Sequence, residues 1–128
     1  MTLYERIGGQ DGIAQLLRHF YADVRQHQVL GPIFNQRIHD WPAHLVKIGE
    51  FWARQTGGPS RYAGGFAGAH VPLGIGPAHL DAWLSLWDFN CRRHLPPQEA
   101  QELSAIARRI GGQLLRILSG NAGLQIGS

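Results

Sequence analysis

The sequence predicts an all-α fold, and three observations lead to that prediction. Apolar residues recur every three or four positions along several segments, as they do on the buried face of a helix. Glycine and proline stand between these segments, where they end helices or begin them. No segment alternates apolar and polar residues as a half-buried strand does. At 128 residues, the chain is long enough for one hydrophobic core but not for two.

The first two helices are expected near the N-terminus. Thr2 and Glu5 have the spacing of a capping box, in which each side chain accepts a hydrogen bond from a backbone amide of the first turn. Gly8-Gly9 end this short helix. We expect Asp11 to cap the second helix and Gly31-Pro32 to stop it. Its predicted buried face consists of Ile13, Leu16, Leu17, Phe20, Tyr21 and Val24.

Three more helices are expected to begin near Trp41-Pro42, after Pro77 and at Pro96-Pro97, because proline suits the first helical turn. Gly111-Gly112 lie inside the last of them. Glycine there costs on the order of 1 kcal/mol per residue, so the pair indicates a close packing point. The first of the three carries His44, Ile48, Phe51 and Trp52 on adjacent faces. The buried residues predicted for the other two are Leu80, Trp83, Leu84, Leu86 and Trp87; and Leu103, Ile106, Ile110, Leu114 and Ile117.

A glycine-rich segment from Gly57 to His70 is predicted to be a long loop, with a short helix around His70 as a further option. A long loop in a compact domain is often functional. We expect residues 1–120 to form the single domain and residues 121–128 to form a flexible tail.

The composition argues against several classes of protein. The isoelectric point of 9.6 reflects a net charge of only +3, and the arginines are scattered, whereas nucleic-acid binding needs a concentrated basic face. No run approaches the roughly 20 apolar residues of a membrane span, and the N-terminus has no secretory pattern. Cys91 is the only cysteine, so no internal disulfide can form. We therefore expect a cytoplasmic protein without nucleic-acid or membrane partners.

Seven histidines in so short a chain suggest a ligand for a metal or cofactor. The sequence has no HExxH, CxxC or ExxH pattern and no dinucleotide-binding glycine motif. A haem needs one histidine on its iron and an aromatic pocket around its ring. Composition alone leaves this open, because aromatic residues at helical spacing also build ordinary cores. The aromatic residues that could surround a haem ring are Phe20, Phe34, Phe51, Trp52, Phe66, Trp83 and Trp87.

Three segments carry a combined motif. They are Phe20-Tyr21 with the later LGPIFN of residues 30–35, WPAHLVKIGEFW over residues 41–52, and HVPL over residues 70–73 leading to DAWL over residues 81–84. In this order they resemble the truncated haemoglobins, short globins with a two-over-two helical sandwich. The resemblance runs from about Thr2 to Gly120 and is closest to group III, although Gly57-Gly58-Pro59 with Tyr62 is more typical of the other groups.

The resemblance implies haem b as cofactor and His70 as the proximal iron ligand. Tyr21 and Trp83 match the family's distal hydrogen-bond donors, with ordinary core packing as the alternative for Trp83. His44 matches the distal histidine, and four roles are open for it: binding the ligand, gating its entry, capping the pocket or ligating iron. Ile48 would lie over the iron. The other expected haem contacts are Phe34, Leu45, Lys47, Phe51, Arg61, Tyr62, Leu73 and Ile75.

The implied function is the binding of oxygen, nitric oxide and carbon monoxide. With Tyr21 and Trp83 both donating, oxygen should leave slowly, which suits redox chemistry better than transport. That chemistry would be nitric oxide dioxygenase-like or peroxidase-like, with a reductase or other electron donor that the sequence does not identify. A non-enzymatic oxygen carrier or sensor that acts through a partner is the alternative, and a haem-free helical module is a third. We expect a monomer or weak dimer.

Overall fold

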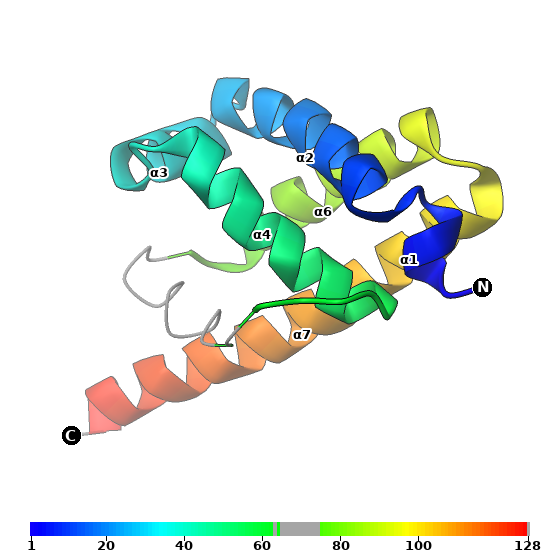
Figure 1. Cartoon of the computed structure of the whole chain (residues 1–128). Helices are drawn as coiled ribbons and strands as arrows, with labels where there is room; N and C mark the ends of the chain where they lie inside the picture. The colour runs from blue at the N-terminus through cyan, green and yellow to red at the C-terminus, as the bar shows by residue number, and fades with distance from the viewer. Residues whose placement is uncertain (63, 65–74, 128) are drawn as a thin grey trace.

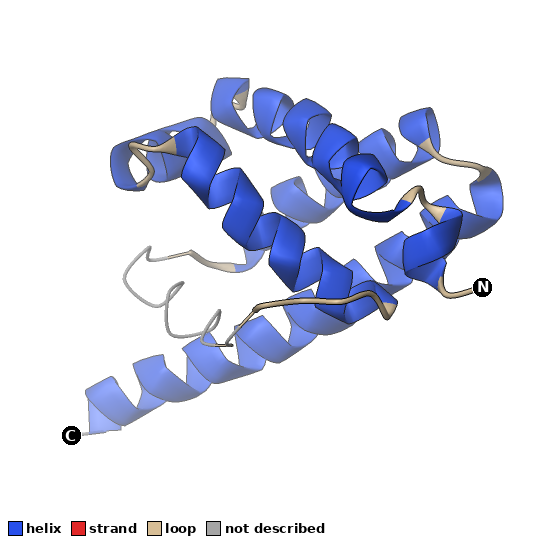
Figure 2. Cartoon of the chain, in the orientation of Figure 1, coloured by secondary structure: helices blue, strands red, loops and turns tan. Residues whose placement is uncertain are grey.

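The computed structural model describes residues 1–62, 64 and 75–127, with side chains up to residue 117. The described residues form helices and loops without a strand (Figure 2), so the predicted all-α class is confirmed. Six helices are present in this part of the chain: α1 Leu3–Arg6, α2 Gly9–Gln26, α3 Leu30–Arg37, α4 Trp41–Thr56, α6 Pro77–His94 and α7 Pro97–Gly127.

The four longest helices form two packed pairs. Helix α2 contacts α4, and α6 contacts α7 along its length. Figure 1 shows the first pair lying across the second, and α2 also contacts α6, which joins the two layers. This is the two-over-two sandwich that the resemblance to the truncated haemoglobins implied. The shared core contains Phe20, Val24, Leu30, Trp52, Ala53, Trp87, Cys91 and Leu103.

The predicted capping box at the N-terminus is confirmed. Glu5 N donates to Thr2 Oγ1 at 3.1 Å, and Thr2 N donates to Glu5 Oε1 at 3.2 Å. Arg6 then binds the first turns of α7: its guanidinium donates to Glu99 at 3.2 Å and to Glu102 at 2.6 and 2.9 Å. The short helix α1 is thereby held against α7.

The expected cap of α2 is wrong. Helix α2 begins at Gly9 after Gly8, whose φ of 98° is a left-handed conformation that glycine adopts without strain. Asp11 lies within the first turn instead, where its charge suits the positive end of the helix. A side chain at Gly12 would also meet the carbonyl oxygen of Ile7 at 1.9 Å, so the chain needs glycines at this bend.

Gly31-Pro32 do not stop α2, because they belong to a helix of their own. Helix α2 ends at Gln26, and the imidazole Nδ1 of His27 accepts hydrogen bonds from the amides of Val29 and Leu30 at the start of α3. Pro32 fits within the first turn of α3, where its missing N–H costs nothing. Gly31 is required for close packing: a Cβ there would lie 2.7 Å from the carbonyl oxygen of Arg25.

The later helix starts are as predicted. Helix α4 begins at Trp41, with the Asp40 carboxylate accepting from Ala43 N at 3.1 Å. Helix α6 begins at Pro77, and α7 at Pro97. The backbone of α7 stays helical to Gly127, which differs from the loose tail expected from residue 121. The division into a domain and a tail remains a prediction.

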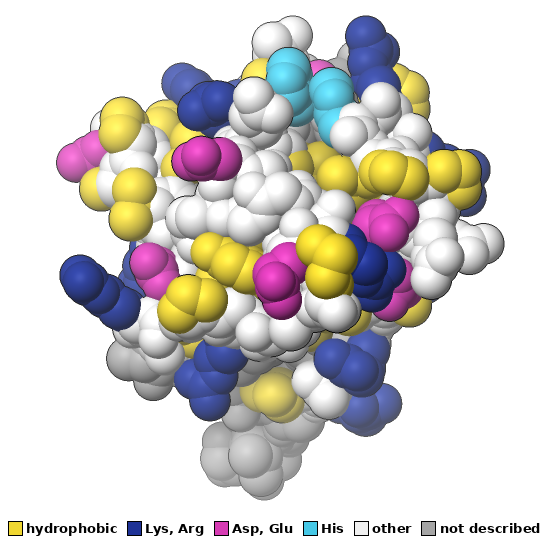
Figure 3. Space-filling view, turned by 45° about the vertical axis from the view of Figure 1, so that its right-hand side comes forward, with side chains coloured by type: hydrophobic (Ala, Val, Ile, Leu, Met, Phe, Trp, Pro, Cys, Tyr) yellow, Lys and Arg dark blue, Asp and Glu magenta, His cyan; other side chains and the backbone are white. Residues whose placement is uncertain are grey.

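No helix in the described residues is both long and apolar enough to cross a membrane. Basic and acidic side chains are interspersed over the face shown in Figure 3, and neither sign forms a continuous patch there. This agrees with the scattered arginines of the sequence.

Candidate functional site

A cavity of about 290 Å³ lies between the two helix layers and is bounded by α2, α3, α4, α6 and α7. Most of its lining is aliphatic or aromatic, and no aspartate or glutamate is among the described lining residues. Its apolar wall consists of Leu30, Phe34, Ile38, Ile48, Phe51, Trp52, Ile75, Leu80, Ala107, Ile110 and Leu114. A space of this kind suits a flat apolar molecule.

Most of the residues predicted for the site meet at this cavity. The lining includes Tyr21, His44, Ile48, Trp83, Phe34, Lys47, Phe51, Tyr62 and Ile75. Leu45 and Arg61 are not part of it: Leu45 packs against the hydrophobic core, and Arg61 is exposed, with its amide donating to the Glu50 carboxylate at 2.8 Å. His70 and Leu73 lie outside the described residues, so the proximal ligand remains a prediction.

Tyr21 is a buried residue of the cavity wall, with 5% of its surface exposed. Burial raises the pKa of its hydroxyl well above the ordinary value, and a hydrogen bond with Trp83 opposes that rise in part. Because an indole N–H can only donate, the hydroxyl oxygen of Tyr21 accepts this bond. The hydroxyl therefore keeps its proton at neutral pH and can donate it to a ligand in the cavity.

The ring of Trp83 is held by aromatic packing. It stacks on Trp87 at 5.4 Å with 8° between the planes, and Trp87 stacks in turn on Trp52 at 4.4 Å. Phe20 meets Trp83 edge-on at 5.0 Å, and Trp87 Nε1 donates to the Leu103 carbonyl at 3.3 Å. Trp83 therefore belongs both to the packed core and to the cavity wall, so the two alternatives considered for it are not exclusive.

His44 reaches the cavity from α4, on the side of Tyr21. The two rings meet edge-on, with centroids 5.9 Å apart and 85° between the planes. Trp41, one turn before His44, contacts both of these rings without lining the cavity itself. The rings of Tyr21, Trp41 and His44 therefore form an aromatic cluster between the facing ends of α2 and α4.

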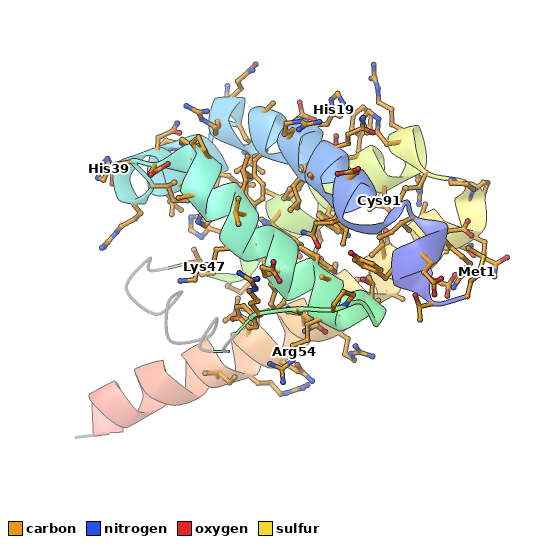
Figure 4. The ribbon with its side chains drawn as sticks, viewed as in Figure 1. Met1, His19, His39, Lys47, Arg54 and Cys91 are labelled. Carbon is orange, nitrogen blue, oxygen red and sulfur yellow. The ribbon has the colours of Figure 1, made fainter. Side chains whose placement is uncertain are left out.

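Two cationic side chains line the cavity, Arg37 from α3 and Lys47 from α4. Both residues are exposed, so they stand at its solvent side, and Figure 4 shows Lys47 on α4. His79 also lines the cavity; its Nδ1 accepts from the amide of Gly76 at 2.9 Å, so a neutral His79 carries its proton on Nε2. These groups can bind the carboxylates of a molecule whose apolar part fills the interior.

Sequence reasoning missed several lining residues. Arg37 and His79 were not among the residues predicted for the site, yet both line the cavity. Ile110 and Leu114 were placed in the core by their spacing, which could not show that this part of the core is hollow. The lining also includes Leu30, Ile38, Trp52, Leu80, Ala107 and Gly111. Among the described residues, no group of three or more histidine, cysteine, aspartate or glutamate side chains is arranged to hold a metal ion directly.

Comparison with known proteins gives a consistent result. The family model of the bacterial-like globins matches residues 2–102. The group 3 truncated hemoglobin ctb of Campylobacter jejuni is 38% identical over 84 residues, which cover 62% of this chain and 66% of that protein, just under two thirds of its length. The chain therefore belongs to the bacterial-like globin family and, within it, to the truncated haemoglobins of group III.

Solved structures of other hemoglobins have the same fold. The crystal structure of the group III truncated hemoglobin of Campylobacter jejuni superposes with a TM-score of 0.80 at 31% identity, over 86% of this chain and 91% of that one. The group II truncated hemoglobin of Bacillus anthracis gives 0.78 at 26% identity, over 90% of each chain. The thermostable hemoglobin of Thermobifida fusca gives 0.78 at 26% identity, over 90% and 97%.

The cavity itself fits the haem that this family implies. A porphyrin ring needs an apolar slot, and the described wall is aliphatic and aromatic. Its two propionates need positive or donating groups, which Arg37, Lys47 and His79 supply at a wall without acidic residues in the described part of the chain. Tyr21 and His44 provide polar atoms on one side of the same space. The residues present therefore match the apolar ring, the carboxylates and the gas ligand of a haem-binding globin.

Proposed function

We propose that this globin binds haem b through His70 and uses the bound gas in redox chemistry, either the oxidation of nitric oxide or the reduction of peroxide. The observation that carries the proposal is the buried Tyr21 hydroxyl, held in an apolar cavity by Trp83. A haem iron supplies gas binding and one-electron chemistry when it is present. The residues of the chain determine how long a ligand stays and what reaches it.

Tyr21 would hold the ligand. A hydrogen bond to a partly charged oxygen in a dry cavity is worth roughly 1.5–3 kcal/mol, or about ten- to a hundredfold in the dissociation rate. Slow release is a disadvantage for a carrier, which has to unload its oxygen. It favours a protein that consumes the oxygen where it is bound.

The apolar wall would exclude water. Ile48 and Phe51 from α4 and Leu80 from α6 line the cavity, so a ligand beside Tyr21 has few competing hydrogen-bond partners. In a site of low polarity, each remaining hydrogen bond is stronger than it is in water. Arg37 and Lys47 would orient the haem by binding its propionates at the solvent side, and a redox cycle would also need an external electron donor.

The first test is haem binding itself. The purified chain is titrated with haem and its absorption spectrum recorded, beside His70→Gly and the control His39→Gly, which replaces an exposed histidine before α4. We expect a Soret band that shifts on reduction and with carbon monoxide in the native chain and in His39→Gly, and an altered or absent band in His70→Gly. Identical spectra in all three would assign the iron to another histidine. No saturable binding would exclude a haem function.

The second test separates redox chemistry from simple carriage. Turnover of nitric oxide or peroxide is measured under steady state, with an equal concentration of free haem as the control. Turnover well above free haem, and slowed in Tyr21→Phe, supports the proposal. Turnover no faster than free haem would leave a carrier or sensor.

A further inference from the structure

Four side chains form a ladder between the facing ends of α2 and α4. Tyr21 and Arg25 are one turn apart on α2, and Trp41 and His44 are one turn apart on α4. The Trp41 ring lies 5.7 Å from that of Tyr21 and 5.6 Å from that of His44, edge-on to the latter at 87°. The Arg25 guanidinium lies 4.7 Å from the centre of the Trp41 ring.

The ladder has an inner and an outer layer. Tyr21 and His44 line the cavity, whereas Trp41 and Arg25 do not. Trp41 is half-buried and Arg25 is exposed, so the order from cavity to solvent is His44, Trp41, Arg25. The rings of Tyr21, Trp41 and His44 all contact one another, with centroids 5.6, 5.7 and 5.9 Å apart, so His44 cannot turn away from the cavity toward Trp41 unless that indole also moves.

Trp41 is itself held in place. A guanidinium over an indole face is attracted by the negative charge of the ring, and tryptophan is the best partner for this interaction. The backbone of Arg25 is fixed as well, because its carbonyl oxygen accepts from Asn35 Nδ2 at 3.1 Å and packs tightly under Gly31 of α3. Helix α3 thus holds the backbone of Arg25, and the guanidinium of Arg25 packs over the ring of Trp41.

We infer that Trp41, clamped by Arg25, is a positioning residue that keeps His44 over the cavity and limits the rate at which gas ligands enter. This inference rests on the proposed function, since it concerns access to the same cavity. It adds two residues that touch neither the cavity nor a ligand in it. The alternative role for both residues is simply to join α2 to α4.

The test is the association rate of carbon monoxide with the haem-loaded protein, measured after flash photolysis together with the thermal midpoint. Trp41→Leu removes the ring, and Trp41→Phe keeps a smaller ring in its place. Arg25→Gln removes the cation and Arg25→Lys keeps one. The matched control is Arg18→Gln, an exposed arginine on the same helix.

We expect Arg25→Gln to raise the association rate by about two- to fivefold, the range that corresponds to an exposed cation–π contact. Trp41→Leu should raise it further, while Trp41→Phe and Arg25→Lys stay closer to the native rate and Arg18→Gln matches it. A purely structural role would lower the thermal midpoint and leave the rate unchanged.

Native association rates in both Arg25→Gln and Trp41→Leu, with a normal Soret band, would overturn the inference. If Trp41→Leu does not fold, the exposed Arg25 pair decides the question alone. A native chain without a Soret band would instead mean that the proposed function has failed, which is a distinct outcome.

Discussion

The indole of Trp83 donates its hydrogen bond to the hydroxyl oxygen of Tyr21. Trp83 has a single N–H, so its donor is already used within the protein. The sequence suggested two donors acting side by side on a ligand. The structure arranges them in series: Trp83 holds Tyr21, and the hydrogen of Tyr21 remains available for the cavity.

This series arrangement predicts coupled effects on oxygen release. Tyr21→Phe should speed oxygen dissociation by about ten- to a hundredfold, because a charge-assisted hydrogen bond is lost. Trp83→Phe should have a smaller effect, and the double variant should resemble Tyr21→Phe alone. Stopped-flow displacement of oxygen measures all three rates in a double-mutant cycle. Tyr4→Phe, a tyrosine outside the cavity, is the control. Two effects that multiply would mean that the residues act as independent donors.

The adjacent glycines of α7 should respond in opposite ways to alanine. A Cβ at Gly112 meets no atom within 4 Å, so Gly112→Ala should raise the free energy of unfolding by about 0.5–1 kcal/mol. A Cβ at Gly111 would lie 3.1 Å from a methyl carbon of Leu80, so Gly111→Ala should gain less or lose stability. Urea denaturation compares the two. Equal gains would show that Leu80 moves aside at no cost.

Cys91 should be inert in the folded protein. Burial and, to a smaller extent, the nearby Asp88 together raise the pKa of its thiol to about 12. The nucleophilic thiolate is therefore almost absent at neutral pH, and the residue has no exposed surface. We expect a disulfide reagent to label the thiol only after the chain is unfolded in urea. Rapid labelling without urea would show that the core around Cys91 opens readily.

Acid should destabilise the protein partly through His94. Burial lowers the pKa of this imidazole, as do His19, stacked on it at 4.2 Å, and Arg93, while Asp23 opposes them. Between the ordinary pKa of 6.5 and the lower folded value, the unfolded chain binds the proton more readily than the folded chain does. Stability is thus complete above pH 6.5 and is lost as the pH falls through the folded pKa.

This prediction is checked by measuring the urea concentration at the midpoint of unfolding at about pH 7.5 and at about pH 5.5. His94→Gln should lose less stability on acidification than the native chain, and His39→Gln, an exposed histidine elsewhere, should lose as much as the native chain. An unchanged loss in His94→Gln would assign the acid sensitivity to other groups.

Local sequence signals predicted most of the fold. Thr2 and Glu5, Trp41-Pro42 and Pro77 marked helix starts that depend on the first turn alone. The prediction that Gly31-Pro32 stop α2 was wrong, because the same pair suits the end of one helix or the beginning of the next. The imidazole of His27 accepts hydrogen bonds from the amides at the start of α3, and no spacing rule identifies a histidine in this role.

The site was predicted in part, since it depends on contacts between distant segments. Tyr21, His44 and Trp83 came from the family motif and do line one cavity. The motif did not reveal that Trp83 donates to Tyr21 or that Trp41 backs His44, because both contacts join separate helices. Leu45, predicted as a haem contact, packs against the hydrophobic core, and its contact with haem stays a prediction.

The ion pairs of Arg6 also affect the order of events at synthesis. Arg6 leaves the ribosome before its partners Glu99 and Glu102, which follow 93 and 96 positions later. Domains acquire their structure as units while the chain emerges from its N-terminus. Helix α1 of this globin therefore stays without its ionic partners until the residues at the start of α7 have been translated.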